Sequence, residues 1–480
     1  MKNLLKKTVV AVLTGEAQAV LKKYRPKIVA VTGSVGKTAT KDAIYAVVAR
    51  GAHARKSEKS FNSEIGIPLT ILGAPNAWDN PLRWLLNFID GLFLIFFTTK
   101  YPEWLVLEVG ADRPGDIKNV ASWLPVDIAV ITRLPEMPVH VEFFDSPEEV
   151  VEEKAALVGA LKHGGTLVLF GDDGRSAALS ARTGERVLTF GFSEKAEVRG
   201  GGVTLLFEPA RPDDSGRSDG ERKEMWPIGM SAHLTIGGTS APISILGGIG
   251  AHTLLPLLAG AAVGHALGKN ISEIVESLKS YEPPPGRMRL LRGIKDTLII
   301  DDTYNSSPAA VIAALDTLAL VNPAGRKITP VGRAAQTRDI PPGRRDDLSG
   351  RAAQERGITP ARRIAVLGDM LELGRHSTAE HRKIGEHAAK TADMLLTIGF
   401  RAREMAQGAL DNGMPDAHIL QYEDAAKAGA ELENILREGD CVLVKGSQSM
   451  RMERVVEEIM LEPERATELL VRQDEEWKRR

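Results

Sequence analysis

The segment from Ile28 to Thr38 reads Ile-Val-Ala-Val-Thr-Gly-Ser-Val-Gly-Lys-Thr, an apolar run that ends in a glycine-rich turn followed by a lysine and a threonine. The run predicts a buried strand, and the residues from about Thr38 to Val48 predict the helix after it. In loops of this kind the backbone amides point at phosphate oxygens, the lysine neutralises their charge, and the next hydroxyl binds Mg²⁺. The feature predicts an α/β fold and an enzyme that uses a nucleoside triphosphate.

We call residues 33–38 the phosphate loop. The full motif has another glycine five residues before its Gly-Lys pair, where this chain has Val31, so only its second half is met. A Gly-Ser turn also joins strands to helices without any phosphate, and this alternative stays open for the loop alone. We expect the nucleotide to contact Gly33, Ser34, Val35, Gly36, Lys37 and Thr38.

Composition narrows the class of protein. A chain of 480 residues is long enough for about two or three domains with their own cores. Its net charge of -2 gives no reason to expect general nucleic-acid binding. The single cysteine, Cys441, excludes an intrachain disulfide and fits a reducing compartment. No convincing signal cleavage site follows residues 1–27, so we do not interpret them as a signal peptide. We expect them to form an amphipathic helix, and we expect a cytoplasmic protein.

The pattern of apolar runs predicts two α/β domains. From residue 28 to 282, short apolar runs alternate with helical stretches, as in a mostly parallel sheet covered by helices. Within this central ATP-binding domain, residues 202–207 and 231–236 are expected to be antiparallel strands of a small side sheet.

Pro283-Pro-Pro-Gly286 is the clearest linker, since three prolines cannot continue a helix. We expect a Rossmann-like α/β domain over residues 283–480, with strands at 297–300, 364–367 and 441–444 and a helix over Pro308–Leu320. Residues 326–363 are rich in Arg, Gly and Pro and are expected to be a mobile surface insertion.

The segment Pro81–Phe97 is strongly apolar, yet short and polar for a bilayer span. Arg83, Asn87 and Asp90 stand at i, i+4 and i+7 and are expected to form one narrow polar stripe on an otherwise apolar helix. Three interpretations of the apolar face stay open. It packs against another domain or subunit, it lies in the membrane interface with Trp84 as an anchor, or it spans the membrane. Peripheral attachment at the inner face of the membrane is thus an alternative location.

Several polar residues follow predicted strands. Glu108 comes directly after the apolar residues 104–107, so we expect it at the carboxyl end of a strand, where open α/β sheets bind ligands. A carboxylate there could hold a second Mg²⁺. His140 and Glu142, beyond the strand that ends at Thr132, could add a metal ligand and its orienting partner. A helix cap, a surface charge or an ordinary loop histidine remain the structural alternatives.

Three further charged residues are less specific. Lys154 lies in Glu-Glu-Lys-Ala-Ala-Leu, and helix statistics alone predict a solvated lysine in a charged patch. In the second half, Arg287 and Asp302 adjoin predicted strands. A guanidinium suits a γ-phosphate and a carboxylate suits ribose hydroxyls, although each residue taken singly could belong to a structural turn.

Ordered motifs, spread from about residue 28 to 457, together resemble those of the Mur ligase family. The resemblance implies an ATP-dependent amide ligase of peptidoglycan precursor synthesis, which joins D-alanyl-D-alanine to a UDP-N-acetylmuramoyl-tripeptide through an acyl phosphate. The motifs that carry it are Thr32–Thr38, Phe61–Leu69, Leu107–Ala111, Pro285–Met288, Ile300–Asn305, Val366–Gly374 and Val444–Ser447.

The resemblance also implies roles for residues. Lys37 and Thr38 would hold ATP phosphates and the first of two Mg²⁺ ions, and Glu108 and His140 would serve the metals. Lys154 matches a lysine that is carbamylated in the family, which turns a cation into an anion that supports Mg²⁺. The catalytic set is thus Lys37, Lys154, His140 and Arg287.

From the second half, Arg287 and Asp302 match residues that reach ATP, and His252 matches one near the adenine. The matched motifs also supply the residues expected to contact the substrate, which are Asn62, Glu64, Tyr304, Asn305, Lys445 and Ser447.

The chain departs from the family pattern in three places. Family members begin with a domain for the UDP group, whereas here the phosphate loop starts at Gly33, so we expect that domain to be absent. Thr253 and Pro256 stand after His252 where the family has asparagines, and the apolar segment 81–97 is extra. Two alternatives to the leading function therefore stay open. One is a ligase or amidating subunit that acts on a lipid-linked cell-wall precursor at the membrane, and the other is a nucleotide-binding regulator without catalysis.

Overall fold

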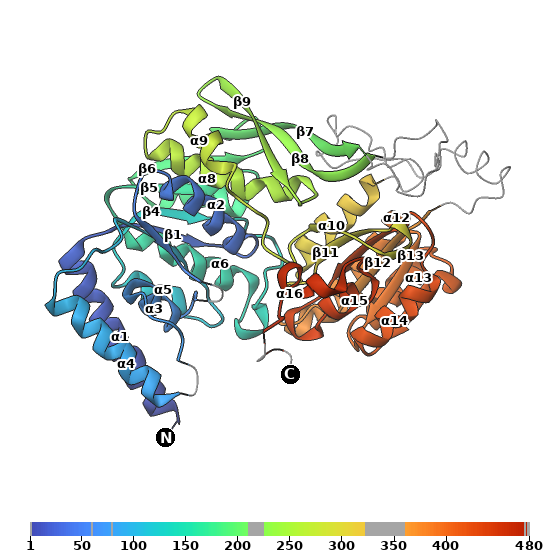
Figure 1. Ribbon diagram of the computed structural model, residues 1–480, viewed down its shortest axis with the longest axis horizontal. Coiled ribbons are helices and arrows are strands. Elements are labelled where there is room, and N and C mark those ends of the chain that lie inside the picture. The colour runs from blue at the N-terminus through green and yellow to red at the C-terminus, as the bar shows by residue number, and fades with distance from the viewer. Residues whose placement is uncertain are drawn as a thin grey trace. The chain divides into compact units, whose positions relative to one another are not determined.

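The computed structural model describes residues 2–58, 61–77, 80–209, 225–321, 361–474 and 477 (Figure 1). The chain divides into two compact units. Unit 1 comprises Met1–Gly201, His233–Ile243 and Leu255–Tyr281, and unit 2 comprises Gly202–Ala232, Ser244–Leu254 and Glu282–Arg480. The predicted insertion at 326–363 lies outside the described residues except for its last three.

The larger sheet has the order β2-β3-β1-β4-β5-β6-β7-β8-β9 among the described residues. Its neighbours from β2 to β7 are parallel, which confirms the predicted sheet type. The separate side sheet was wrongly predicted, because β7 pairs in parallel with the otherwise open edge of β6 and extends the same sheet. The strands are β1 (Lys27–Thr32), β2 (Ala54–Lys56), β3 (Trp104–Glu108), β4 (Val126–Ile131), β5 (Leu161–Phe170), β6 (Arg186–Gly191), β7 (Val198–Pro209), β8 (Met225–Ile236) and β9 (Thr239–Leu246).

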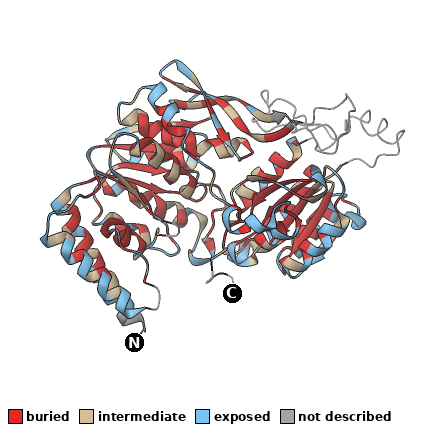
Figure 2. Ribbon diagram, viewed as in Figure 1, coloured by how far each residue is buried: buried red, intermediate tan, exposed pale blue. Residues whose placement is uncertain are grey.

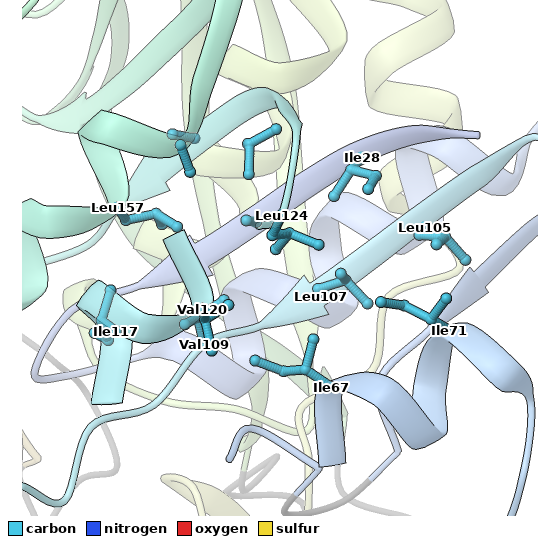
Figure 3. Packing of buried hydrophobic residues seen from close by; sticks show 14 of the residues in the cluster. Ile28, Ile67, Ile71, Leu105, Leu107, Val109, Ile117, Val120, Leu124 and Leu157 are labelled. Carbon is cyan, nitrogen blue, oxygen red and sulfur yellow. The ribbon is translucent and has the colours of Figure 1, made fainter. Parts of the chain in front are cut away.

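Helices cover both faces of the parallel strands in unit 1 (Figure 1). On one face, Leu105 and Leu107 of β3 pack with Ile67 and Ile71 of α3 and with Val120 of α5 in one buried cluster (Figure 3). On the other face, α2 and α8 pack together. Because both sides are buried, these strands are continuous apolar runs, which is why the sequence located them. The helices are α1 (Lys2–Tyr24), α2 (Lys37–Ala49), α3 (Gly66–Leu72), α4 (Pro81–Phe96), α5 (Asp116–Ala121), α6 (Pro147–Ala155), α7 (Gly174–Ala178), α8 (Leu255–Ala266) and α9 (Ile271–Leu278).

Helix α1 is anchored to the core of unit 1 and carries α4 at its side (Figure 1). Leu13, Ala17 and Val20 of α1 are fully buried at i, i+4 and i+7. Gly91 of α4 lies against the carboxylate of Glu16, and a Cβ at position 91 would overlap that carboxylate. A larger residue at position 91 would therefore displace the carboxyl group of Glu16.

The predicted polar stripe of α4 was wrong for Asn87. This side chain is buried and its Nδ2 donates a hydrogen bond to the carbonyl of Pro75 (2.8 Å), whereas Arg83 and Asp90 are exposed. Helical periodicity alone could not show that the amide group of Asn87 faces inward, where a backbone carbonyl accepts its hydrogen bond. Among the described residues, no helix has the length and apolar character needed to cross a membrane.

The sheet of unit 2 has the order β10-β11-β15-β12-β13-β14 among the described residues. Only its edge strand β10 runs antiparallel to its neighbour, and the remaining pairs are parallel, as a Rossmann-like domain requires. Its strands are β10 (Arg289–Arg292), β11 (Leu298–Asp302), β12 (Arg363–Gly368), β13 (Met394–Ile398), β14 (Ile419–Tyr422) and β15 (Cys441–Lys445). Its helices are α10 (Pro308–Leu320), α12 (Ser377–Thr391), α13 (Arg403–Asp411), α14 (Ala425–Ile435), α15 (Glu453–Ile459) and α16 (Ala466–Leu469).

The contact between α1 and α4 makes stability depend on pH through Glu16. Burial raises the pKa of this carboxyl group to about 7, and its Oε2 has no hydrogen-bond partner among the described residues. The unfolded chain ionises at lower pH than the folded chain, so the free energy of unfolding falls as pH rises from 4.5 through about 7. We expect Glu16→Gln, which cannot ionise, to melt at a higher temperature than the wild type at about pH 8 and at the same temperature near pH 4. Exposed Glu103→Gln is the control, and an equal shift at both pH values would contradict the prediction.

Candidate functional site

The phosphate loop connects β1 to the N-terminus of α2. Gly33 has a φ of +139°, and a Cβ there would overlap the side chain of Thr132 just beyond β4. Gly36, with a φ of +85°, is the last residue before α2. The backbone N–H of Ser34 donates to the carbonyl of Arg133 (3.1 Å), which fixes the loop to the end of β4. The loop therefore leads directly into the N-terminus of α2, whose first backbone N–H groups lack intrahelical acceptors and attract anions.

Polar groups inside the loop suit a phosphate ligand. The hydroxyl of Ser34 is buried and has no hydrogen-bond partner among the described residues. The ammonium group of Lys37 donates to the carbonyl of Gly33 (3.0 Å) and so lies across the loop. Thr132 Oγ1 donates to the carbonyl of Val35 (2.8 Å). Because a buried hydroxyl without a partner is costly, the loop favours a ligand with acceptor oxygens over a purely structural turn.

Glu108 lies at the same edge of the sheet, as predicted. It is the last residue of β3, pairs with Val31 of β1, and is only 5% exposed. Asn62 Nδ2 donates to Glu108 Oε1 (3.3 Å), so two residues of separate motifs meet there. Glu64, which follows Asn62 closely in sequence, instead forms a half-exposed ion pair with Lys6 of α1 (2.9 Å).

His140 precedes a short 3₁₀ turn, Val141–Phe143, and has a φ of +67° in the left-handed region. Its proposed orienting partner, Glu142, is exposed. Within the described parts of the chain, no cluster of three or more His, Cys, Asp or Glu side chains could hold a metal ion. Mg²⁺ commonly binds one or two protein oxygens together with substrate phosphates and water. Thr38 and Glu108 therefore fit Mg²⁺ as part of a Mg²⁺–nucleotide complex.

Lys154 is the most unusual ionisable residue of the site. It lies in α6, its side chain is 0% exposed, and its Nζ has no hydrogen-bond partner among the described residues. Burial lowers its pKa to about 7, and the positive charge of Lys37 lowers it further, against the opposing effects of Glu153 and Asp112. The solvated lysine that helix statistics predict was wrong.

Glu153, the neighbour of Lys154, was missed by the sequence analysis. Its carboxylate accepts hydrogen bonds from the backbone N–H groups of Gly115 (2.8 Å), Ile117 (2.5 Å) and Lys118 (3.2 Å) at the start of α5. Glu153 therefore caps a helix and forms no ion pair with its neighbour Lys154. An acidic residue that caps a helix distant in sequence leaves no local pattern.

In unit 2, Asp302 and Lys445 stand opposite each other at the carboxyl ends of β11 and β15. Lys445 Nζ lies 2.6 Å from Asp302 Oδ2 and donates to the carbonyl of Asn305 (2.8 Å). The other carboxylate oxygen of Asp302 accepts from the N–H of Met288 (3.2 Å). Two residues that the sequence assigns to separate ligands are thus bonded to each other and hold the Asn305 segment against β15.

Arg287 and Tyr304 also meet. The guanidinium carbon of Arg287 lies 4.1 Å from the centre of the Tyr304 ring, a cation–π contact, and the N–H of Tyr304 donates to the carbonyl of Gly286 (3.0 Å). Ser447 Oγ accepts from the N–H of Leu371 (2.8 Å). His252 lies in a short 3₁₀ turn, Ala251–Leu254, and is half-buried.

Arg472, close to the C-terminus, fixes the same segment and was also missed. It donates to the carbonyls of Thr303 (2.5 Å) and Tyr304 (3.0 Å). Two further hydrogen bonds bind it to Glu453 Oε2 (3.0 and 2.8 Å), which is fully buried. Since 168 residues separate Arg472 from Tyr304, no spacing rule could have found the contact.

The buried ammonium group of Lys154 yields a prediction about stability. Its folded pKa of about 7 lies below its ordinary value of 10.5, so the unfolded chain binds more protons between these values. The penalty is complete below about pH 7 and disappears as pH rises to 10.5. In CO₂-free buffer, we expect Lys154→Met to have a higher free energy of unfolding than the wild type at pH 6, with a difference that shrinks by pH 10. Lys162→Met, at a partly exposed ion pair with Asp127, serves as the control. A difference that does not change with pH would refute the burial of the charge.

Comparison with known proteins identifies the family that the two domains match. The model of the Mur ligase middle domain matches residues 31–207, and that of the Mur ligase glutamate ligase domain matches residues 348–448. The UDP-N-acetylmuramoyl-tripeptide--D-alanyl-D-alanine ligase of Bacillus subtilis (strain 168) is 25% identical over 452 residues, which are 93% of this chain and 79% of the relative. The enzyme of the same name from Mycobacterium leprae (strain TN) is 28% identical over 437 residues, with coverages of 88% and 71%.

Solved structures show the same fold. The MurF ligase of Thermotoga maritima in complex with ADP has a TM-score of 0.67 at 24% identity, covering 94% of this chain and 83% of that one. MurF from Acinetobacter baumannii has a TM-score of 0.67 at 20% identity, with coverages of 94% and 80%. The two domain models lie in the same order as the two sheets and together cover more than half of the chain. The chain therefore belongs to the Mur ligase family.

Proposed function

We propose that this protein is an ATP-dependent amide ligase that joins D-alanyl-D-alanine to a UDP-N-acetylmuramoyl-tripeptide. Relatives that bear the name of this activity match 88% or more of the chain. The observation that carries the proposal is the group at the carboxyl edge of the larger sheet, where the phosphate loop, the buried Glu108 and the buried Lys154 belong to one unit. Lys37 connects them, since it lies in the loop and its charge acts on Lys154.

The reaction needs charge stabilisation at two steps. A substrate carboxylate oxygen bonds to the γ-phosphorus of ATP as the bond to ADP breaks, and an acyl phosphate results. The amine nitrogen then bonds to the acyl carbon, loses a proton, and phosphate leaves. Lys37 and the amides of the phosphate loop would neutralise the phosphoryl oxygens during the first step. Thr38 and Glu108 would hold Mg²⁺, which supplies further positive charge when bound.

Carbamylation of Lys154 is the second part of the proposal. A pKa of about 7 leaves much of the amine neutral near pH 7, and a neutral amine is the form that attacks CO₂. Nζ would bond to the carbon of CO₂ and release a proton, leaving an N-carboxylate. The repulsion between Lys154 and Lys37 would become an attraction, and the buried Nζ would gain polar neighbours. The new carboxylate would also support Mg²⁺.

The remaining assignments stay predictions based on the family pattern. His140 would serve the metals, and Arg287, Asp302 and His252 would contact ATP. The residues assigned to the substrate are Asn62, Glu64, Tyr304, Asn305, Lys445 and Ser447.

A second candidate is a ligase or amidating subunit that acts on a lipid-linked cell-wall precursor. The observation that favours it is the large apolar surface of α4, which the described part of the chain leaves uncovered. The two candidates share the same site and differ only in the donor molecule. A panel of both donors distinguishes them.

We expect ATP-dependent phosphate release when the protein receives UDP-N-acetylmuramoyl-tripeptide with D-alanyl-D-alanine, and little release when either is omitted. Lys37→Ala should lower the rate at least about 100-fold, because it removes a cation aimed at the phosphates. Lys162→Ala, on the surface of the same unit, should retain the rate. Release with a lipid-linked donor alone would favour the second candidate. ATP binding without any substrate-dependent release would favour a regulator.

Carbamylation has its own test. We expect the wild type to lose activity in CO₂-depleted buffer and to regain it on addition of bicarbonate. Lys154→Ala should lose activity, and a short carboxylate such as propionate should partly restore it by occupying the vacated space. Lys37→Ala is the matched control, since a missing cation is not replaced by an anion. If Lys154→Ala keeps full activity, the proposed role of Lys154 is wrong.

A further inference from the structure

Helix α4 presents a second apolar surface to solvent. Its residues and the one after it expose large apolar side chains by between 46% and 76% each, and exposed residues dominate its outer side (Figure 2). We call this set the apolar stripe. It consists of Leu82, Leu85, Leu86, Ile89, Leu92, Phe93, Phe96 and Phe97.

The apolar stripe is continuous and separate from the side of α4 that holds the helix in place. At about 100° per residue, its members within the helix fall in an arc about 120° wide. The opposite side packs against the core of unit 1 through Trp84, Phe88, Leu94 and Ile95. The stripe is therefore not needed to attach α4 to unit 1, and its exposure requires another explanation.

Cations stand near both ends of the α1–α4 pair. The exposed charged residues of α1 with described side chains are all lysines, at positions 6, 7, 22 and 23, while its acidic residue Glu16 is buried. Lys6 is partly neutralised by Glu64. Exposed Arg83 lies in the first turn of α4, and exposed Lys100 follows the helix by four residues. Asp90 of α4 is also exposed, but among the described side chains of α1 and α4 the exposed cations outnumber this one exposed acid, so the surroundings of the stripe attract an anionic surface.

Two other occupants fit less well. A transmembrane position is excluded by length, since 16 residues of helix reach about 24 Å and a bilayer core is about 30 Å thick. A second copy of this chain would place the same cationic ends opposite each other in a two-fold interface, and like charges repel. An anionic lipid interface would bury the apolar stripe among acyl chains and attract the lysines through its negative headgroups.

We propose that the apolar stripe docks unit 1 on a membrane surface of anionic phospholipids, with α4 lying in the plane of the interface. The stripe inserts among the upper acyl chains, and the exposed Lys7 and Lys22 of α1 contact the headgroup phosphates. This docking is independent of the ligase reaction, because none of its residues belongs to the phosphate loop or to the residues assigned to ATP.

The test uses the full chain and vesicles of phosphatidylglycerol mixed with phosphatidylcholine. We expect the wild type to float with these vesicles, to bind pure phosphatidylcholine at least about tenfold more weakly, and to be released by salt. The variant Leu86→Gln/Ile89→Gln/Phe93→Gln should lose binding at least about tenfold. The matched control Leu246→Gln/Phe400→Gln/Leu461→Gln changes similarly exposed apolar residues outside α4 and should bind like the wild type.

Both variants should keep the melting temperature of the wild type and its phosphate release with soluble substrates, which separates docking from catalysis. If the triple variant of α4 melts lower, the single change Phe96→Ser, at the most exposed member of the stripe, gives the decisive comparison. Wild-type protein that fails to float would overturn the proposal, as would α4 variants that float unchanged. A wild type that is dimeric by light scattering, with a monomeric α4 variant and no vesicle binding by either, would identify a second copy as the occupant and likewise overturn it.

Discussion

The electrostatic conflict around Lys154 governs the candidate site. A fully buried ammonium group is disfavoured by the loss of solvent and again by the charge of Lys37. The negative charges of Glu153 and Asp112 oppose these two effects but do not cancel them. The conflict is relieved when Lys154 is neutral, when it carries an N-carboxylate, or when phosphate oxygens offset the charge of Lys37. A nucleotide bound at the phosphate loop, as proposed, would therefore be energetically coupled to the chemical state of Lys154, since each would change the electric field at the other.

The register of the parallel strands determines where the phosphate loop and Glu108 lie. Val31 pairs with Glu108 and Thr32 pairs with Ile131, so the carboxyl ends of three strands coincide at one edge. Gly33 then passes Thr132 at a distance that no side chain permits. The phosphate loop and Glu108 lie at the same edge because parallel pairing of β1 with β3 and β4 places the carboxyl ends of these strands side by side.

Several features of this arrangement were predictable from local sequence. Buried parallel strands are continuous apolar runs, and Glu108 marks the end of one because the apolar run stops there. Pro308 at the start of α10 fixed the start of that helix, which the structure confirms over Pro308–Leu320. The burial of Lys154 was not predictable, because Glu-Glu-Lys within a helix has the pattern of a solvated face. Its neighbour Glu153 binds α5, which lies about 35 positions away, and a local pattern does not encode such a contact. The inward turn of Asn87 likewise depends on one carbonyl group, and an amphipathic period does not encode such a contact.

The backbone carbonyls at the C-terminal end of α4 have hydrogen-bond donors, which allows this end of the helix to lie in an apolar environment. Helix ends leave backbone carbonyls without intrahelical partners, and such groups are costly away from water. Here Lys23 Nζ donates to the carbonyls of Leu94 (2.9 Å), Ile95 (3.0 Å) and Phe97 (2.7 Å). The hydroxyl of Tyr24 lies 3.1 Å from the carbonyl oxygens of both Leu94 and Phe97, and its one proton can be donated to either. Side chains of α1 therefore supply the hydrogen-bond donors for the C-terminal carbonyls of α4. Residues beside these carbonyls can enter a medium of low dielectric without exposing unsatisfied backbone groups, which a helix capped only by water could not do.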